Sequence, residues 1–386
     1  MFHRIHSIDI FRAITMVLMI WVNDFWSLKG IPDWLQHAKG NQDFLGFSDI
    51  IFPCFLFIVG MSIPYAIRNR IEKGEKNYQV LIHIALRSIA LLVMGLFTVN
   101  RDSFNAEASG INRQLFTLLM IAAFFLIWNV YPKVTDWKKY LYTGLQVAGV
   151  LILTFLAIHF RGGEDGSQSM RPQWWGILGL IGWAYLFTAT IYLFARKSQL
   201  LVLGFWALFT LINVAGHAGW FSIGFIPGGG SLQGFTFAGI AASLLLDNAK
   251  TPDKQRKLPL SYLGIGVLLV ISGLLLRHHF IISKIQATPT WVFLCNGIAF
   301  GFLALVYFLV DLKGRVHWFD PIKPAGTSTL TCYLVPYIWY SLAAYAFTLP
   351  LFIKTGALGL VKSFVFALII VGITALLGKM RIKLKI

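Results

Sequence analysis

Residues 23–60 read NDFWSLKGIPDWLQHAKGNQDFLGFSDIIFPCFLFIVG, and this stretch joins the end of one apolar segment to the start of the next. The connection between them carries His37, and the second segment begins at Asp49, with Pro53 one turn later. A carboxylate at a helix start can cap free backbone amides and favours the positive end of the helix dipole. The pattern predicts a titratable imidazole at the mouth of a bundle of apolar helices.

Apolar runs also fill most of the rest of the chain. Of the 386 residues, 57% are hydrophobic and 13% are charged, whereas an ordinary soluble domain carries about 25% charged residues. Runs of about 20 apolar residues, the length that crosses a hydrocarbon core, follow one another from Ile10 onward. The composition excludes a soluble enzyme and predicts an all-α polytopic membrane helix bundle, with residues 1–386 forming a single domain.

The apolar runs predict about twelve membrane-spanning helices, with ten as the lower limit. They lie near residues 9–28, 49–68, 80–99, 114–131, 140–159, 174–195, 199–216, 232–247, 259–278, 291–310, 325–346 and 357–378. Of the 33 Lys and Arg residues, 22 fall in the segments on one side and nine in those on the other. Because cytoplasmic loops carry an excess of basic residues, we expect both termini in the cytoplasm, His37 outside, and a location in the cytoplasmic (inner) membrane.

The formal net charge of +17 does not indicate nucleic-acid binding, because the basic residues are scattered between apolar spans. The three cysteines all lie inside apolar runs: Cys54, Cys295 and Cys332. Cysteine behaves there as a small hydrophobe, so neither a disulfide framework nor a metal site is expected. The glycine-rich segment PGGGSLQGF, residues 227–235, lacks a phosphate-loop lysine and is expected to be a turn and close-packing element.

The first predicted span carries a polar stripe. Successive residues of a helix turn by about 100°, which places five residues on one face: Asp9, Arg12, Met16, Ile20 and Asn23. Ionisable residues at membrane depth normally face a protein interior or a wet cavity, so we expect a passage beside this helix. The alternative is that Asp9 and Arg12 form only an interfacial ion pair.

Three more residues are candidates for chemistry or binding. His37 is the strongest single candidate for catalysis, since the unperturbed pKa of imidazole, about 6.5, lies nearest neutrality; the alternative is a solvated loop histidine. Asp49 either fixes the tautomer of His37 by accepting a ring N–H or only caps its helix. Arg87, which shares a helix face with His83, either binds an anionic cofactor or extends to the interface.

The segments SIDIFRAITMVLMIWVND and LQHAKGNQDFLGFSDIIFPCFLFIVGMSI resemble the transmembrane heparan-alpha-glucosaminide N-acetyltransferase family and its bacterial relatives. The residues that match the family pattern are Ser7, Asp9, Phe11, Arg12, Asn23, His37, Ala38, Asp49, Phe52 and Pro53. KIQATPTWVFLCNGIAFGFLALVYFLVD and PAGTSTLTCYL agree less tightly. The chain departs from the pattern in four ways: Ala13 replaces a glycine, the loop between His37 and Asp49 is two residues longer, Ser328 replaces an asparagine, and helices 174–216 are an expected insertion.

The resemblance implies a transmembrane N- or O-acetyltransferase that binds acetyl-CoA from the cytosol, modifies an amino sugar or glycan outside, and forms a homodimer. The nucleotide would bind near Asp9, Arg12 and Arg87, and the pantetheine arm would follow the stripe, which is about 21 Å long at the helical rise. Asn23 would donate to the thioester oxygen, Asp49 would steady the ring, and His37 would act as general base or acetyl carrier. Two other classes remain open: a transporter or flippase for a small polar or glycan substrate, and a structural membrane subunit.

Overall fold

The computed structural model describes residues 5–221, 226–346 and 350–386, and every regular element within them is helical. The longer helices are α1 (His6–Asn23), α2 (Ser48–Glu72), α3 (Asn77–Asn100), α5 (Arg113–Trp128), α6 (Lys138–His159), α7 (Gly176–Ala195), α8 (Gln199–His217), α9 (Ser231–Asn248), α10 (Pro252–Leu276), α11 (Pro289–Tyr307), α13 (Thr329–Ala346) and α14 (Gly356–Lys379). Two short helices, α4 (Ala106–Ser109) and α12 (Lys323–Thr327), join them. Each of the twelve expected spans overlaps one long helix.

The boundaries differ from the expected ones in places that matter for the site. Helix α1 ends at Asn23 rather than near residue 28, because the chain turns there into a 3₁₀ turn, η1 (Phe25–Ser27). The expected span 325–346 is broken at Ser328, whose backbone leaves the helical region between α12 and α13. Apolar periodicity cannot locate such breaks, because the apolar pattern continues across them.

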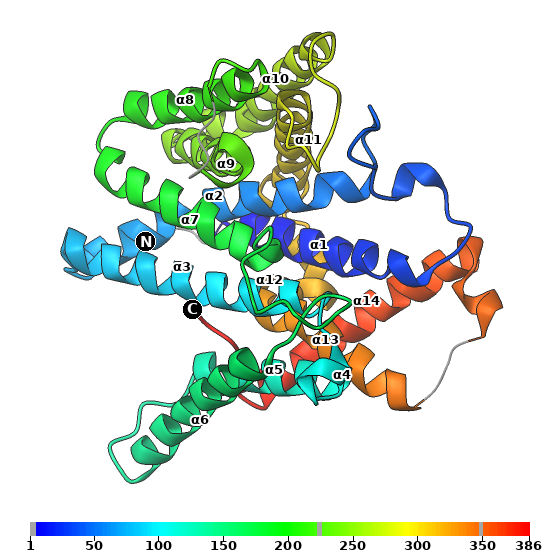
Figure 1. Ribbon diagram of the computed structural model, residues 1–386. Coiled ribbons are helices and arrows are strands. Elements are labelled where there is room, and N and C mark those ends of the chain that lie inside the picture. The colour runs from blue at the N-terminus through cyan, green and yellow to red at the C-terminus, as the bar shows by residue number, and fades with distance from the viewer. Residues whose placement is uncertain (1–4, 222–225, 347–349) are drawn as a thin grey trace.

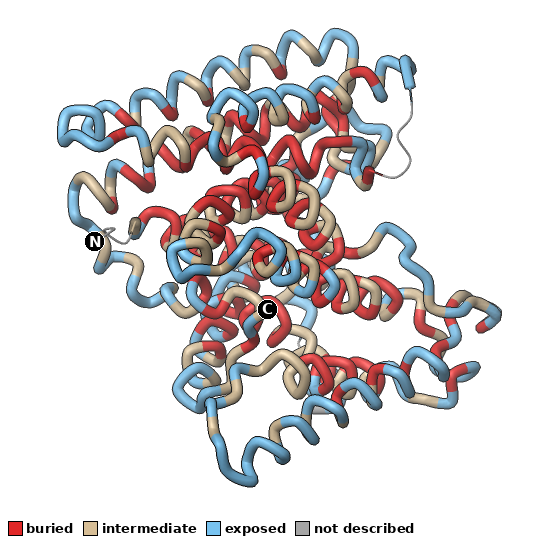
Figure 2. Tube along the Cα trace, turned by 90° about the vertical axis from the view of Figure 1, so that its left-hand side faces the viewer, coloured by how far each residue is buried: buried red, intermediate tan, exposed pale blue. Residues whose placement is uncertain are grey.

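Nine of the helices in the described part of the chain are long and apolar enough to cross a membrane: α2, α3, α6, α7, α8, α9, α10, α11 and α14. Figure 2 shows buried residues along the central helices and exposed residues along the peripheral ones. Helices such as α6 and α10 expose large apolar side chains on most of their length, which suits contact with hydrocarbon. The fold is that of an all-helical, polytopic membrane protein; twelve crossings and cytoplasmic termini remain predictions.

Close packing of α2 on α9 fixes the helix that carries Asp49. A Cβ on Gly60 would lie 1.9 Å from the Thr236 carbonyl oxygen, and one on Gly239 would lie 1.8 Å from the Phe57 oxygen. Only glycine therefore allows the two backbones to touch, as is common between membrane helices. In Figure 1, α1, α2, α3 and α7 run side by side, and the α5–α6 pair extends away from them.

The glycine-rich segment before α9 is a turn, as expected. Gly228, Gly229 and Gly230 all have positive φ, and they form the 3₁₀ turn η3 (Pro227–Gly230). A Cβ on Gly230 would lie 2.6 Å from the carbonyl oxygen of Phe209 in α8. The segment therefore serves backbone geometry and the packing of α8.

Candidate active site

The structure brings His37 and Asp49 together. The short 3₁₀ turn η2 (Asp33–Leu35) precedes His37, and Asp49 lies in the first turn of α2 with its side chain almost fully buried. His37 Nδ1 lies 2.7 Å from Asp49 Oδ1, while Asp49 Oδ2 accepts the backbone N–H groups of Ala38 at 3.0 Å and Gly46 at 3.3 Å. The carboxylate thus binds the loop that carries His37 as well as the ring itself.

Lys284, in the connection between α10 and α11, is the third charged group at this point. Its Nζ lies 3.2 Å from His37 Nδ1 and 3.7 Å from Asp49 Oδ1. Burial lowers the pKa of Lys284, and the nearby Asp49 carboxylate opposes that shift. Because an ionised carboxylate can only accept, the 2.7 Å contact with Asp49 Oδ1 requires the proton on His37 Nδ1. Lys284 then cannot donate to this nitrogen, and its ammonium group balances the carboxylate charge.

That assignment leaves Nε2 of His37 as the atom with a lone pair. No hydrogen bond joins Nε2 to any residue in the described ranges, and 48% of the His37 side chain is exposed. A neutral imidazole held by a carboxylate at one nitrogen, with the other nitrogen open, can accept a proton or attack an electrophile.

The loop that carries His37 is held against the α10–α11 connection. Asp43 accepts the backbone N–H of Ile282 at 2.8 Å and the Nε–H of Arg277 at 2.9 Å. The pKa of Asp43 is lowered, first by the bond from Ile282 and then by Arg277. Within the loop, a Cβ on Gly46 would lie 1.9 Å from the Gln36 carbonyl oxygen. These contacts restrain the backbone on both sides of the imidazole.

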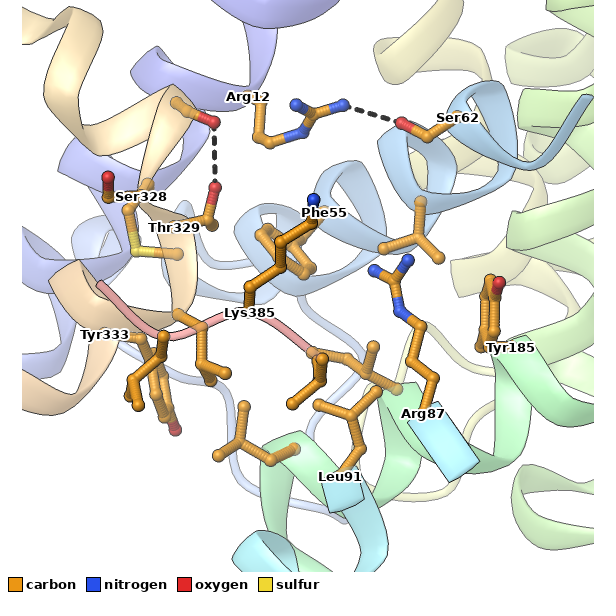
Figure 3. Close-up of a pocket in the computed structure, with 18 of the residues that line it drawn as sticks. Arg12, Phe55, Ser62, Arg87, Leu91, Tyr185, Ser328, Thr329, Tyr333 and Lys385 are labelled. Atoms are coloured by element: carbon orange, nitrogen blue, oxygen red, sulfur yellow. Dashed lines mark hydrogen bonds between the residues drawn. The ribbon is translucent and has the colours of Figure 1, made fainter. Parts of the chain in front are cut away.

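A cavity of about 430 Å³, called the inner cavity because it lies at the predicted cytoplasmic end of α1, contains both predicted arginines (Figure 3). Arg12 Nη2 donates to Ser62 Oγ at 2.6 Å, and its Nη1 lies 3.3 Å from Asp9 Oδ1. The guanidinium of Arg87 lies 4.5 Å from the centre of the Tyr185 ring. Asp9 itself lines a separate recess of about 60 Å³. Arg12 and Arg87 therefore line the same cavity. Asp9 does not line it but is paired with Arg12, which does.

Several lining residues of the inner cavity come from the PAGTSTLTCYL segment, to which no role was assigned from the sequence. They are Gly326, Thr327, Ser328, Thr329, Leu330 and Tyr333. The break between α12 and α13 lies at the wall of the cavity, where the Thr329 hydroxyl donates to the Gly326 carbonyl oxygen at 3.0 Å. The resemblance of this segment to a family motif was the signal that could have identified it.

A second cavity of about 460 Å³, called the outer cavity because it lies at the other, predicted outer end of α1, contains Asn23. Its other polar and aromatic lining residues include Trp26, Arg101, Asp102, Arg113, Gln114, Trp174, Tyr337 and Tyr340. The two cavities share Ile177 and Tyr333 as lining residues. Along the α1 stripe, Arg12 and Met16 line the inner cavity, and Ile20 and Asn23 line the outer one. The stripe therefore faces the protein interior, as expected, although it meets two adjoining cavities rather than one open passage.

His37 is not among the described residues that line either cavity. The connection from α1 to α2 passes over the opposite side of α1, where the Phe47 and Trp21 ring centres lie 5.9 Å apart. Trp21 lies about 160° around the helix from Asn23. The expected meeting of His37 with the outer end of the stripe is thus not formed in this conformation.

Asp24 and Lys362 form a buried ion pair that was missed from the sequence. Asp24 is 2% exposed, and its Oδ2 lies 2.6 Å from Lys362 Nζ and accepts the Ser363 hydroxyl. Its Oδ1 accepts the hydroxyl of Tyr340 at 2.6 Å. Lys362 is a basic residue inside a predicted span, which was the available signal. The cluster fixes the start of the α1–α2 connection directly after Asn23.

Comparison with known proteins places the chain in a family. The model of the family described as "Domain of unknown function (DUF5009)" matches residues 4–222, which is more than half of the chain. The chain belongs to this family. In this DUF5009 protein, the matched range includes the α1 stripe, Arg87 and the His37–Asp49 pair, and it also includes helices 174–216.

Two curated relatives support the resemblance seen in the sequence. Heparan-alpha-glucosaminide N-acetyltransferase of Homo sapiens is 35% identical over 101 residues, and that of Mus musculus is 31% identical over 102 residues. Each alignment covers 25% of the DUF5009 chain and 14% of the relative. The aligned part thus spans about one seventh of the length of these relatives, and it shows the chain to be similar to them.

Proposed function

We propose that the protein is a membrane-embedded acetyltransferase that moves an acetyl group from cytosolic acetyl-CoA to an amino sugar or glycan on the outer side. One observation carries the proposal: the polar stripe of α1 lies along two adjoining cavities, the inner with Arg12 and Arg87, the outer with Asn23. The His37–Asp49 pair, close after this stripe in the chain, adds a base. The names of the two relatives also favour acyl transfer.

In this proposal the inner cavity binds the donor. Its volume of about 430 Å³ lies within the usual range for small-molecule sites. Guanidinium groups match phosphate geometry, and Arg12 is held in place by Ser62 and Asp9. The pantetheine arm would follow Met16 and Ile20, which are apolar, toward the outer cavity. The stripe length of about 21 Å suits an extended pantetheine arm.

The reaction would be carried by Asn23 and His37. The Asn23 amide would donate to the thioester oxygen as negative charge develops there. His37 Nε2 would either take the proton of the acceptor amine or hydroxyl as it attacks, or attack the thioester carbon itself and displace the thiolate of CoA. In the second route the acetyl-imidazole then passes its acetyl group to the acceptor. Asp49 holds the ring in both routes.

The outer cavity would receive the acceptor. Trp26 and Trp174 expose 73% and 52% of their surface, and Arg101 and Arg113 add charge. Exposed aromatic faces with a few polar groups are typical of sites that orient a small polar ligand. Because His37 lies outside this cavity and is held by Asp49, the proposal requires the Asn23 end of the stripe and the His37–Asp49 pair to approach each other in the reacting complex.

A transporter or flippase is the second candidate, and one observation favours it. Two polar cavities that meet at Ile177 and Tyr333 also suit a path for a polar substrate, since intramembrane polar groups often line such paths. Acetyl-CoA separates the two classes: a ligand that binds only the folded state raises the melting temperature. A higher melting temperature in the presence of acetyl-CoA would support the enzyme, whereas a higher melting temperature with free glycan alone would not.

The deciding experiment is mass spectrometry of products after purified protein receives labelled acetyl-CoA and a panel of amino sugars and glycans. We expect a labelled acetyl group on one class of acceptor. His37→Ala should lower the rate of product formation about 10³-fold, whereas His279→Ala, at an exposed histidine of the α10–α11 connection, should leave it unchanged. Absence of any acetylated acceptor with the wild-type protein would contradict acetyl transfer, and full transfer by His37→Ala would contradict the assignment of His37.

A further inference from the structure

The segment that follows α14 folds back onto the inner cavity. Lys383 donates its backbone N–H to Asn129 Oδ1 at 2.8 Å, and Leu384 donates to Thr331 Oγ1 at 3.0 Å. The N–H of Lys385 reaches a carbonyl at the end of α5 at 3.0 Å. Leu384 is 4% exposed and belongs to the main core cluster. The segment is therefore fixed across the ends of α5 and α13.

This attachment presents two lysines to the inner cavity. Lys383, Leu384, Lys385 and Ile386 all line this cavity, so the segment forms part of its wall. Figure 3 shows the ammonium group of Lys385 in the space between Arg12 and Arg87.

The inner cavity is strongly cationic. Four of its lining residues are basic, and none of the described lining residues is Asp or Glu. Like charges that converge on one space repel each other. The Nε of Arg87 is buried and has no hydrogen-bond partner in the described ranges, and a buried donor without a partner is destabilising. A bound anion would remove both costs.

We propose that Lys385 is a phosphate-binding residue and that residues 382–386 form one wall of the donor site. With Arg12 and Arg87 it makes a three-cation site for an anion that carries several phosphate groups. Charge and geometry require only such a polyphosphate. Its identification as acetyl-CoA, which carries a pyrophosphate and a separate ribose phosphate, rests on the proposed function.

The test compares donors with and without phosphates. Dissociation constants are measured by calorimetry for acetyl-CoA, S-acetyl-pantetheine and pyrophosphate, with wild type, Lys385→Gln and Lys385→Arg. Lys379→Gln, at an exposed lysine that does not line the cavity, is the matched control. Loss of one charge-assisted phosphate contact should weaken acetyl-CoA about tenfold.

We expect Lys385→Gln to weaken acetyl-CoA and pyrophosphate but not S-acetyl-pantetheine, and Lys385→Arg to restore most of the affinity. Lys379→Gln should match wild type. Because the Lys385 side chain is exposed, the melting temperature without ligand should not change in any of these variants. In hydrogen exchange, the amides of residues 382–386 should become slower when acetyl-CoA is added to wild type.

Equal affinity of wild type and Lys385→Gln for acetyl-CoA would overturn the inference and leave the proposed function standing. Binding of pyrophosphate that depends on Lys385, with no binding of acetyl-CoA, would support the three-cation site and contradict the proposed donor. A parallel loss of affinity for S-acetyl-pantetheine would also overturn the inference, because it would show that the phosphates are not what Lys385 contacts.

Discussion

The inner cavity and the His37–Asp49 pair differ in how many of their polar atoms already have a hydrogen-bond partner or an opposite charge nearby. Around Asp49, both carboxylate oxygens are bonded to the ring and to loop amides, and Lys284 balances the charge. In the inner cavity, the cations surround open space, and the buried Nε of Arg87 has no hydrogen-bond partner among the described residues. A pre-organised pair orients a reacting group, whereas an excess of charge around space attracts a ligand. The two regions should therefore respond differently to mutation.

The largest expected effect is that of a mutation in the His37–Asp49 pair. His37→Ala should lower kcat for acetyl transfer by about 10³-fold, in the range for a lost acid–base group, and leave the Kd for acetyl-CoA unchanged. Steady-state kinetics and calorimetry on the same preparation would check this. An equal loss in kcat and in donor affinity would remove the distinction between the two regions.

Asp49→Asn should lower kcat by about 10²-fold, since the ring loses its charged partner and its preferred tautomer. If Asp49 acts through His37, the double variant with His37→Ala should be no slower than His37→Ala alone, because residues that act as a unit are not additive. Independent, multiplying losses would mean that Asp49 supports the fold rather than the ring.

Mutations in the inner cavity should have the opposite effect: they should weaken donor binding and leave the rate of the chemical step nearly unchanged. Arg12→Gln should raise KM for acetyl-CoA about tenfold, the effect of losing a hydrogen bond to a charged group, and leave kcat at saturation within about twofold. Arg87→Gln should behave in the same way. A variant that lowered kcat without changing KM would show that the arginine contributes to the chemical step instead.

The smallest effect concerns the loop restraint. The pKa of Asp43 is lowered in the folded protein, so its contribution to stability is complete above the unfolded value of 3.8 and is lost as pH falls through the folded value. Asp43→Asn should therefore lower the melting temperature slightly at pH 7, because a partly exposed ion pair contributes less than about 1 kcal/mol to the free energy of unfolding. The difference from wild type should disappear in strong acid, and a difference that grew with acidity would contradict this sign.

Apolar periodicity was sufficient to predict every long helix, and the α1 stripe was sufficient to predict an interior face, because both depend on local spacing. The likeness to N-acetyltransferases also followed from short motifs. Pairing across the chain could not be predicted in this way. Lys284 reaches His37 only because α10 and α11 return to α2, and Lys385 reaches Arg12 only because α14 is followed by a return segment.

The position of His37 was the main difference from expectation. The sequence predicted that the imidazole would meet Asn23 at the outer end of the α1 stripe, whereas the structure places it at the start of α2, outside both cavities. The path of a long connection depends on which apolar side chains it packs against. Here Phe47 of the connection packs against Trp21 of α1, and no local sequence pattern predicts this contact.

The account depends on transfer along α1 from the Arg12 side to the His37 side. The most direct test uses sealed vesicles with oriented protein, labelled acetyl-CoA only on the Arg12 side and a glycan acceptor only on the His37 side. The account predicts labelled acetyl groups on the acceptor without leakage of acetyl-CoA. Product that forms only when donor and acceptor share one side would contradict it.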